Sequence, residues 1–162
     1  VNNRNQLLPI QTYFYPLDKL TNWNRMYGRS GFVQYQFVLP KASGISGLRT
    51  ALEKISNAGL GSFLAVLKQF GVANQNYLSF PEEGYTLALD FKMSNKVIEL
   101  IKELDSIVLA YGGRVYLAKD ALLNEVSFKQ MYPNWELFQQ TRLRYSALEH
   151  FSSDQSRRLG LQ

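Results

Sequence analysis

The stretch Gly31-Phe-Val-Gln-Tyr-Gln-Phe-Val-Leu39 decides the fold class of this chain. Apolar and polar side chains alternate in it until Pro40, and this period of two predicts a β-strand with one buried face. Four side chains share the face that we expect to be the core side: Val33, Tyr35, Phe37 and Leu39. Gln34 and Gln36 share the other face, about 6–7 Å apart at the usual rise of a strand.

Further strands and two helices are predicted around this strand. The expected strands are 62–70, 84–91 and 114–118, and the middle one places Tyr85, Leu87, Leu89 and Phe91 on one face. A turn is expected at 41–47. A helix is expected after it, because apolar residues recur at helical spacing at Ile45, Leu48, Leu52 and Ile55. Ser94 is expected to cap a second helix, with a buried stripe of Val97, Ile98, Ile101, Leu104 and Val108 that ends before Gly112-Gly113.

The ends of the chain are less regular. Residues 1–30 are expected to be mostly loop, 121–150 to be helices broken at Pro133, and 151–162 show no clear period. The order strand, helix, strand, strand, helix, strand, followed by helices, predicts an α+β fold. Its sheet should carry two helices on one face and be followed by a C-terminal helical segment.

Composition excludes several classes of protein. The 162 residues are 46% hydrophobic and 19% charged, which is typical of a folded globular chain. With no cysteine and the single histidine His150, no thiolate or multi-histidine metal site is expected, and a reducing compartment is favoured. We expect a cytoplasmic protein without a transmembrane segment, with membrane association left open, and we expect the chain to be a piece of something longer.

Positive charge is concentrated in the first third. The net charge is +5, and residues 1–50 hold six basic side chains (Arg4, Lys19, Arg25, Arg29, Lys41 and Arg49) against the single acid Asp18. This imbalance favours an anionic ligand, a phosphate group or an acidic surface of the same protein. The basic residues are scattered and no nucleic-acid-binding motif accompanies them, so nucleic acid is not an expected partner.

A few polar residues stand out as candidates for binding, and each also has an ordinary explanation. Gln34 and Gln36 are either solvated or a pair of amides for a polyhydroxylated ligand. Lys68, inside an apolar strand, either extends to solvent or binds an anion. Tyr116 and Lys119 place a phenol and an ammonium at the end of a short strand. No catalytic constellation is visible, and Gly59-Leu-Gly61 lacks the rest of a dinucleotide fingerprint.

Several ordered segments together resemble a known family. The segments are Tyr15-Pro-Leu-Asp18, Trp23-Asn-Arg-Met-Tyr-Gly28, 31–40, 62–68, Phe70-Gly71, Leu78-Ser-Phe-Pro81, Gly112-Gly-Arg-Val-Tyr-Leu-Ala-Lys-Asp120, Met131-Tyr-Pro133, Phe151-Ser-Ser-Asp154 and Arg157-Arg-Leu159. As a set they are similar to the C-terminal portion of the decaprenylphosphoryl-β-D-ribose 2-oxidase group. This is a group of FAD-linked oxidoreductases of the vanillyl-alcohol-oxidase and aldonolactone-oxidase type.

The resemblance implies a function and a division of the chain. The full-length protein would oxidise a hydroxyl of a sugar or polyprenylphosphoryl sugar by hydride transfer to flavin. FAD would be bound mainly by an N-terminal region of the same protein, so the fragment alone is expected to be inactive and free of FAD. Residues 1–113 would form a substrate-binding (cap) domain with a largely antiparallel sheet, and 114–162 would complete the FAD domain.

The resemblance also implies roles for single residues. Six would bind substrate: Gln34, Gln36, Lys68, Phe70, Thr86 and Ala88. Tyr116 and Lys119 would lie against the flavin, with Lys119 catalytic, and no metal is implied. Mycobacterial members carry asparagine at the position of Thr86 and cysteine at that of Ala88, so the pocket is not identical. Two other classes stay open from the residues alone: a free-standing binding module for sugars or phosphorylated lipids without redox activity, and an interaction domain.

Overall fold

A computed structural model describes residues 7–162 of the chain; Arg4, one of the basic residues named above, lies outside this range. The described residues contain one four-stranded sheet in the order β2-β3-β1-β4. The strands are β1 (Phe32–Pro40), β2 (Ala65–Phe70), β3 (Gly84–Lys92) and β4 (Arg114–Val115), and each neighbouring pair is antiparallel. The predicted α+β class and the antiparallel sheet are therefore confirmed.

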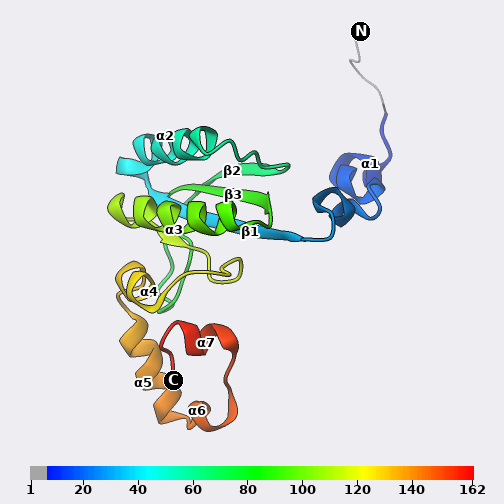
Figure 1. Cartoon of the computed structure of the whole chain (residues 1–162). Helices are drawn as coiled ribbons and strands as arrows, with labels where there is room; N and C mark the ends of the chain where they lie inside the picture. Colours follow the sequence, from blue (N-terminus) through cyan, green and yellow to red (C-terminus); the bar gives the residue numbers. More distant parts are fainter. Residues whose placement is uncertain (1–6) are drawn as a thin grey trace.

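Helices α2 (Lys41–Asn57) and α3 (Asn95–Ala110) cover one face of this sheet (Figure 1). The core side predicted for β1 is confirmed, because Val33, Tyr35, Phe37 and Leu39 are all buried. They pack with Leu87, Leu89 and Phe91 of β3 and with Val97, Ile101, Leu104 and Val108 of α3. Ser94 caps α3 as predicted, and its hydroxyl accepts a hydrogen bond from the Val97 amide at 3.3 Å.

Helix α2 differs from the prediction in its start and in part of its buried face. It begins at Lys41, directly after Pro40, instead of following a turn. Of the four predicted apolar positions, Leu48 and Ile55 are buried, whereas Ile45 and Leu52 are 67% and 49% exposed. The buried face also includes Gly44 and Gly47. A Cβ at Gly47 would lie 2.6 Å from a Leu39 methyl group, so the missing side chains let the helix approach the sheet closely.

The strand boundaries and the N-terminal segment also differ from expectation. The second strand begins at Ala65, and the last strand ends at Val115 because the chain turns there, with the Lys119 amide bonded to the Tyr116 carbonyl. Residues expected to be loop form α1 (Ile10–Phe14) and the 3₁₀ helices η1 (Pro16–Lys19) and η2 (Trp23–Tyr27). They lie beyond the start of β1, away from α2 (Figure 1).

The C-terminal segment is helical as predicted. It contains α4 (Glu125–Met131), α5 (Trp135–Arg144), α6 (Ala147–His150) and α7 (Asp154–Arg158), and the helices break at Pro133. Helix α7 lies in the tail for which no regular structure was expected, and Leu159 and Leu161 after it are buried. Within residues 7–162 no helix combines the length and hydrophobicity needed to cross a membrane.

Candidate functional site

The second face of the sheet, opposite α2 and α3, carries the predicted substrate-binding residues. Strand residues that pair directly across an antiparallel ladder point to the same face. Gln36 pairs with Ala88, and Thr86 pairs with Lys68. By the same register, six residues share the second face: Gln34, Gln36, Lys68, Phe70, Thr86 and Ala88. The structure therefore brings together all six, which come from three strands.

Gln36 lies at the centre of this face and is held in one orientation. Its Nε2 donates to the hydroxyl of the buried Thr86 at 3.1 Å, and its backbone carbonyl accepts from the Tyr116 amide at 2.8 Å. The side-chain carbonyl of Gln36 can then accept a hydrogen bond from a ligand hydroxyl. Lys68, on the edge strand, is exposed, which agrees with both interpretations of this lysine.

A row of aromatic rings connects the two ends of the site. The rings of Phe70 and Phe80 meet edge to face at 5.8 Å, and Phe80 stacks on Tyr116 at 4.4 Å. Phe80 is buried and was not among the predicted site residues, although it lies in one of the segments that carry the resemblance. Nothing in the periodicity of the sequence marks it, because it belongs to the loop between β2 and β3.

The Phe80 loop is fastened to β4 by an ion pair. Arg114 donates to Glu82 at 2.7 Å and to the Ser79 carbonyl at 3.0 Å. Burial raises the pKa of Glu82, and the Arg114 guanidinium opposes this shift. These contacts hold Phe80 beside Tyr116, so the aromatic row is supported from the loop side.

A cavity of about 540 Å³ opens beside Gln34 on the second face. Its walls come largely from apolar side chains of the N-terminal segment and β2 region: Leu17, Leu20, Trp23, Met26, Phe63 and Leu64. Asp90, which pairs with Gln34 in the sheet and is 2% exposed, also lines it and accepts from the Tyr27 hydroxyl at 3.3 Å. Asp90 was not among the predicted site residues, because an isolated acid in an alternating strand gives no signal by itself.

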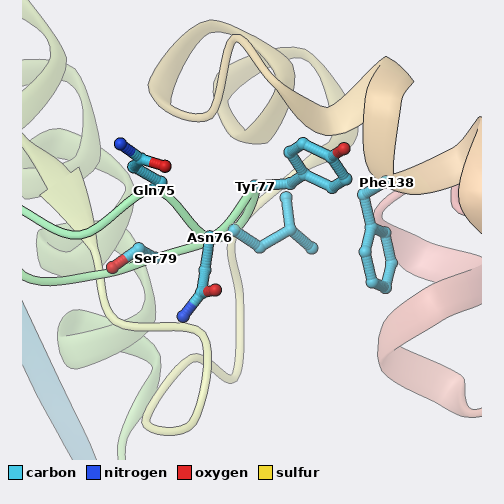
Figure 2. Close-up of a pocket in the computed structure, with 6 residues that line it drawn as sticks. Gln75, Asn76, Tyr77, Ser79 and Phe138 are labelled. Carbon is cyan, nitrogen blue, oxygen red and sulfur yellow. The ribbon is translucent and has the colours of Figure 1, made fainter.

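A second hollow of about 600 Å³ lies outside this site. It is formed by residues 75–79 and by Phe138 of α5 (Figure 2). Its lining includes the side-chain amides of Gln75 and Asn76 and the rings of Tyr77 and Phe138. None of the predicted site residues contributes to it. We therefore place the candidate site on the second face of the sheet.

Tyr116 and Lys119 lie where β4 ends. Tyr116 is half-buried in its stack with Phe80, whereas Lys119 is exposed on the turn that follows. In the described part of the chain, no carboxylate lies within ion-pair distance of the Lys119 ammonium. The two residues are joined through the backbone, because the Lys119 amide donates to the Tyr116 carbonyl at 2.9 Å.

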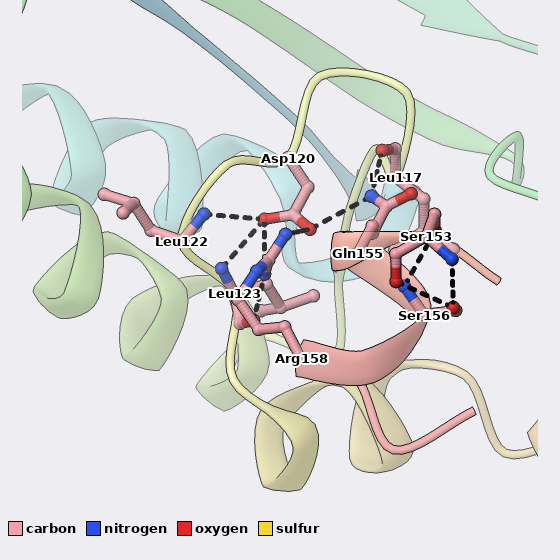
Figure 3. A network of polar contacts seen from close by, with 8 residues as sticks. All are labelled: Leu117, Asp120, Leu122, Leu123, Ser153, Gln155, Ser156 and Arg158. Atoms are coloured by element: carbon pink, nitrogen blue, oxygen red, sulfur yellow. Dashed lines mark hydrogen bonds and ion pairs between the residues drawn. The ribbon is translucent and has the colours of Figure 1, made fainter. Parts of the chain in front are cut away.

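The turn that carries Lys119 is bound to α7 through Asp120. The Asp120 carboxylate receives hydrogen bonds from two backbone amides of its own loop and from the side chains of Gln155 and Arg158 (Figure 3). Its side chain is 2% exposed. Among the described residues, no group of three or more potential metal ligands is assembled.

Comparison with known proteins relates this chain to an oxidoreductase. It is 39% identical over 158 residues to the "Decaprenylphosphoryl-beta-D-ribose oxidase" of Mycolicibacterium smegmatis (strain ATCC 700084 / mc(2)155). The match covers 98% of this chain and 34% of that protein, in its C-terminal portion. The resemblance predicted from the sequence segments is therefore confirmed. A Streptomyces coelicolor relative, "Uncharacterized protein in mprA 5'region", is 36% identical over 115 residues, 70% of this chain and 31% of that protein.

The chain thus spans about a third of the length of these curated relatives. No protein-family model matches it.

Proposed function

We propose that this chain is the substrate-binding and C-terminal part of a FAD-dependent oxidoreductase that oxidises a sugar hydroxyl. The observation that carries the proposal is the gathering of six predicted site residues, four of them polar and one aromatic, on the second face of the sheet, with Tyr116 and Lys119 at its end. The similarity to a decaprenylphosphoryl-ribose oxidase supports it. The substrate is a polyprenylphosphoryl ribose or a related sugar such as an aldonolactone.

The two parts of the chain have different roles in this proposal. Residues 1–113 provide three strands of the sheet and the substrate-binding residues of its second face. Residues 114–162 add the short strand β4 to the same sheet and pack against the FAD-binding region of the full-length protein. In support of this division, helices α5 and α6 contain no buried residue, although they carry apolar side chains such as Leu137 and Leu143. Another part of the protein would cover such a surface.

The residues of the site bind and orient the sugar. Gln34 and Gln36 present amides to its hydroxyl groups, Lys68 suits a substrate phosphate, and Phe70 forms an apolar wall. Bound FAD would supply the acceptor for the hydride of the sugar carbon, and the hydroxyl proton would leave to a base or to solvent. Lys119 stabilises the negative charge that grows on the flavin side during this transfer, and Tyr116 shields that region from water.

The proposal is tested by anaerobic flavin bleaching in the full-length protein. A short-chain polyprenylphosphoryl ribose or an aldono-1,4-lactone is expected to bleach the bound flavin. A full-length protein that contains no flavin would contradict the proposal and favour a binding module without redox activity. Gln36→Ala is expected to slow bleaching because it removes hydrogen bonds to the sugar. Gln69→Ala, at an exposed position in the same sheet, is the matched control and should bleach at the normal rate.

A further inference from the structure

The turn that carries Lys119 is held on both sides by α7. Before the lysine, the Leu117 carbonyl accepts from Gln155 Nε2 at 2.6 Å. After it, the Leu123 carbonyl accepts from the Arg158 guanidinium. Gln155 and Arg158 lie 35 or more positions further along the chain, so tertiary structure alone brings them to this turn.

Asp120, the neighbour of Lys119, joins these two contacts into one network (Figure 3). Its Oδ1 accepts from the amides of Leu122 and Leu123 at 3.0 and 2.8 Å. Its Oδ2 accepts from Arg158 Nη2 at 2.9 Å and from Gln155 Nε2 at 3.2 Å. The buried carboxylate therefore connects the bend of the loop to α7 through directional, charge-assisted bonds.

Helix α7 is itself a firm support. Ser153 and Ser156 cap it reciprocally, with each side-chain oxygen accepting from the other residue's amide at 3.0 and 2.9 Å. Leu159 and Leu161, which follow the helix, are 1% and 6% exposed. The helix is therefore fixed at its start by the cap and beyond its end by burial.

An ion pair that buries its carboxylate is a costly way to close a loop. The Asp120 side chain is 2% exposed and that of Arg158 is 31% exposed, so the cost falls mainly on the carboxylate, which loses its hydration. What the pair provides is geometry, since a guanidinium binds a carboxylate in a fixed orientation. The network holds the chain at Leu117, two residues before Lys119, and at Asp120, directly after it. The lysine side chain stays exposed and has no carboxylate partner in residues 7–162.

From this arrangement we propose that Asp120, Gln155 and Arg158 are positioning residues that hold the Lys119 ammonium at the reacting end of the site. This inference rests on the proposed function, because it takes Lys119 to act on the flavin side. It extends that function because the segment around α7 would support catalysis although it does not touch the substrate.

The test uses the full-length FAD-loaded protein with Arg158→Lys, which keeps the charge but loses the two-pronged geometry. Flavin reduction at saturating polyprenylphosphoryl ribose is expected to slow about tenfold or more with little change in KM, because misplacement of a catalytic group by about 1 Å can cost up to about a hundredfold. The midpoint potential of the bound flavin should fall, as in Lys119→Ala, because a cation moves away from the reduced ring. Arg157→Lys is the matched control, since Arg157 pairs with the exposed Asp154 on the same helix.

A double-mutant cycle separates positioning from general damage to the fold. In a Lys119→Ala background, Arg158→Lys is expected to cause no further loss of rate or potential. If both changes reduce the rate independently, the inference is wrong. Gln155→Met, which removes the bonds to Leu117 and Asp120 but keeps the ion pair, provides the same comparison if Arg158→Lys does not fold.

The two proposals fail in different ways. If Lys119→Ala slows reduction and lowers the potential but both α7 variants behave like wild type, the positioning inference is wrong and the proposed function stands. If Lys119→Ala itself changes neither quantity, the role of Lys119 in the proposed function is refuted, and the positioning inference falls with it.

Discussion

Asp105 makes the stability of this protein depend on pH, and the effect can be calculated from its surroundings. This α3 residue is 4% exposed, and its Oδ1 accepts from the Tyr35 hydroxyl at 2.8 Å. Burial raises its pKa from 3.8 to about 7; the nearby Asp120 also raises the pKa, whereas the Tyr35 hydrogen bond and Arg158 lower it. The folded state therefore keeps a proton that the unfolded chain has already lost between these pH values.

The sign of the effect follows from this difference in bound protons. Since the unfolded state binds fewer protons than the folded state between pH 3.8 and about 7, stability declines as the pH rises through this window and levels off above it. A shift of about three pKa units corresponds to a loss of about 4 kcal/mol at most. Asp105→Asn keeps an acceptor for Tyr35 and has no charge to bury, so it should remove this decline.

The measurement is urea unfolding of the 162-residue chain at pH 4.5 and pH 8. The two proteins are expected to have similar free energies of unfolding at pH 4.5, with Asp105→Asn more stable by about 2–4 kcal/mol at pH 8. Tyr35→Phe is the control: it removes the hydrogen bond that lowers the pKa of Asp105, so it should extend the decline to higher pH. An Asp105→Asn variant with the same pH dependence as wild type would refute the reasoning.

Three further outcomes are expected. Lys119→Ala in the full-length protein should slow flavin reduction about a hundredfold to a thousandfold, and Lys119→Arg should restore the rate poorly. The free energy of unfolding should change by less than about 0.5 kcal/mol. A reduction rate equal to that of wild type at saturating substrate would remove Lys119 from the site. Gly84→Ala should lower stability by about 1–3 kcal/mol, because its Cβ would collide with the Leu39 carbonyl oxygen, whereas Gly61→Ala, with open space around it, should not. The isolated 162-residue chain should bind no FAD, since no phosphate-cradling segment is visible in its sequence; stoichiometric flavin in the purified fragment would contradict this.

The candidate site depends on information that the sequence carries unevenly. The alternation in β1 and β3 was enough to place Gln36 and Thr86 on faces of their strands. It could not show that these two residues are hydrogen-bonded, because the register of two strands separated by about fifty residues depends on the whole sheet. Phe80 and Asp90 were missed for the same reason: a loop residue and a single buried acid become part of a site only through their neighbours.

Local physics explains why some elements were predicted and others were not. The strands and α3 show their period in the sequence because one side of each element is buried against a continuous apolar core. The start of α2 was predicted wrongly, and its predicted apolar stripe is right only in part. Leu48 and Ile55 are buried, whereas Ile45 and Leu52 are exposed because the helix approaches the sheet closely through Gly44 and Gly47. Helix α7 has almost no period, since its five residues are held by a cap and by contacts with Asp120.

The sequence by itself therefore determined the fold class, the buried face of the central strand and the resemblance to an oxidoreductase group. These properties depend on short-range alternation and on ordered segments that can be read along the chain. Only the tertiary structure decided that residues of three strands share one face and that α7 holds the turn of Lys119. Both require contacts between residues far apart in sequence, and such contacts depend on packing of the whole domain rather than on any local preference.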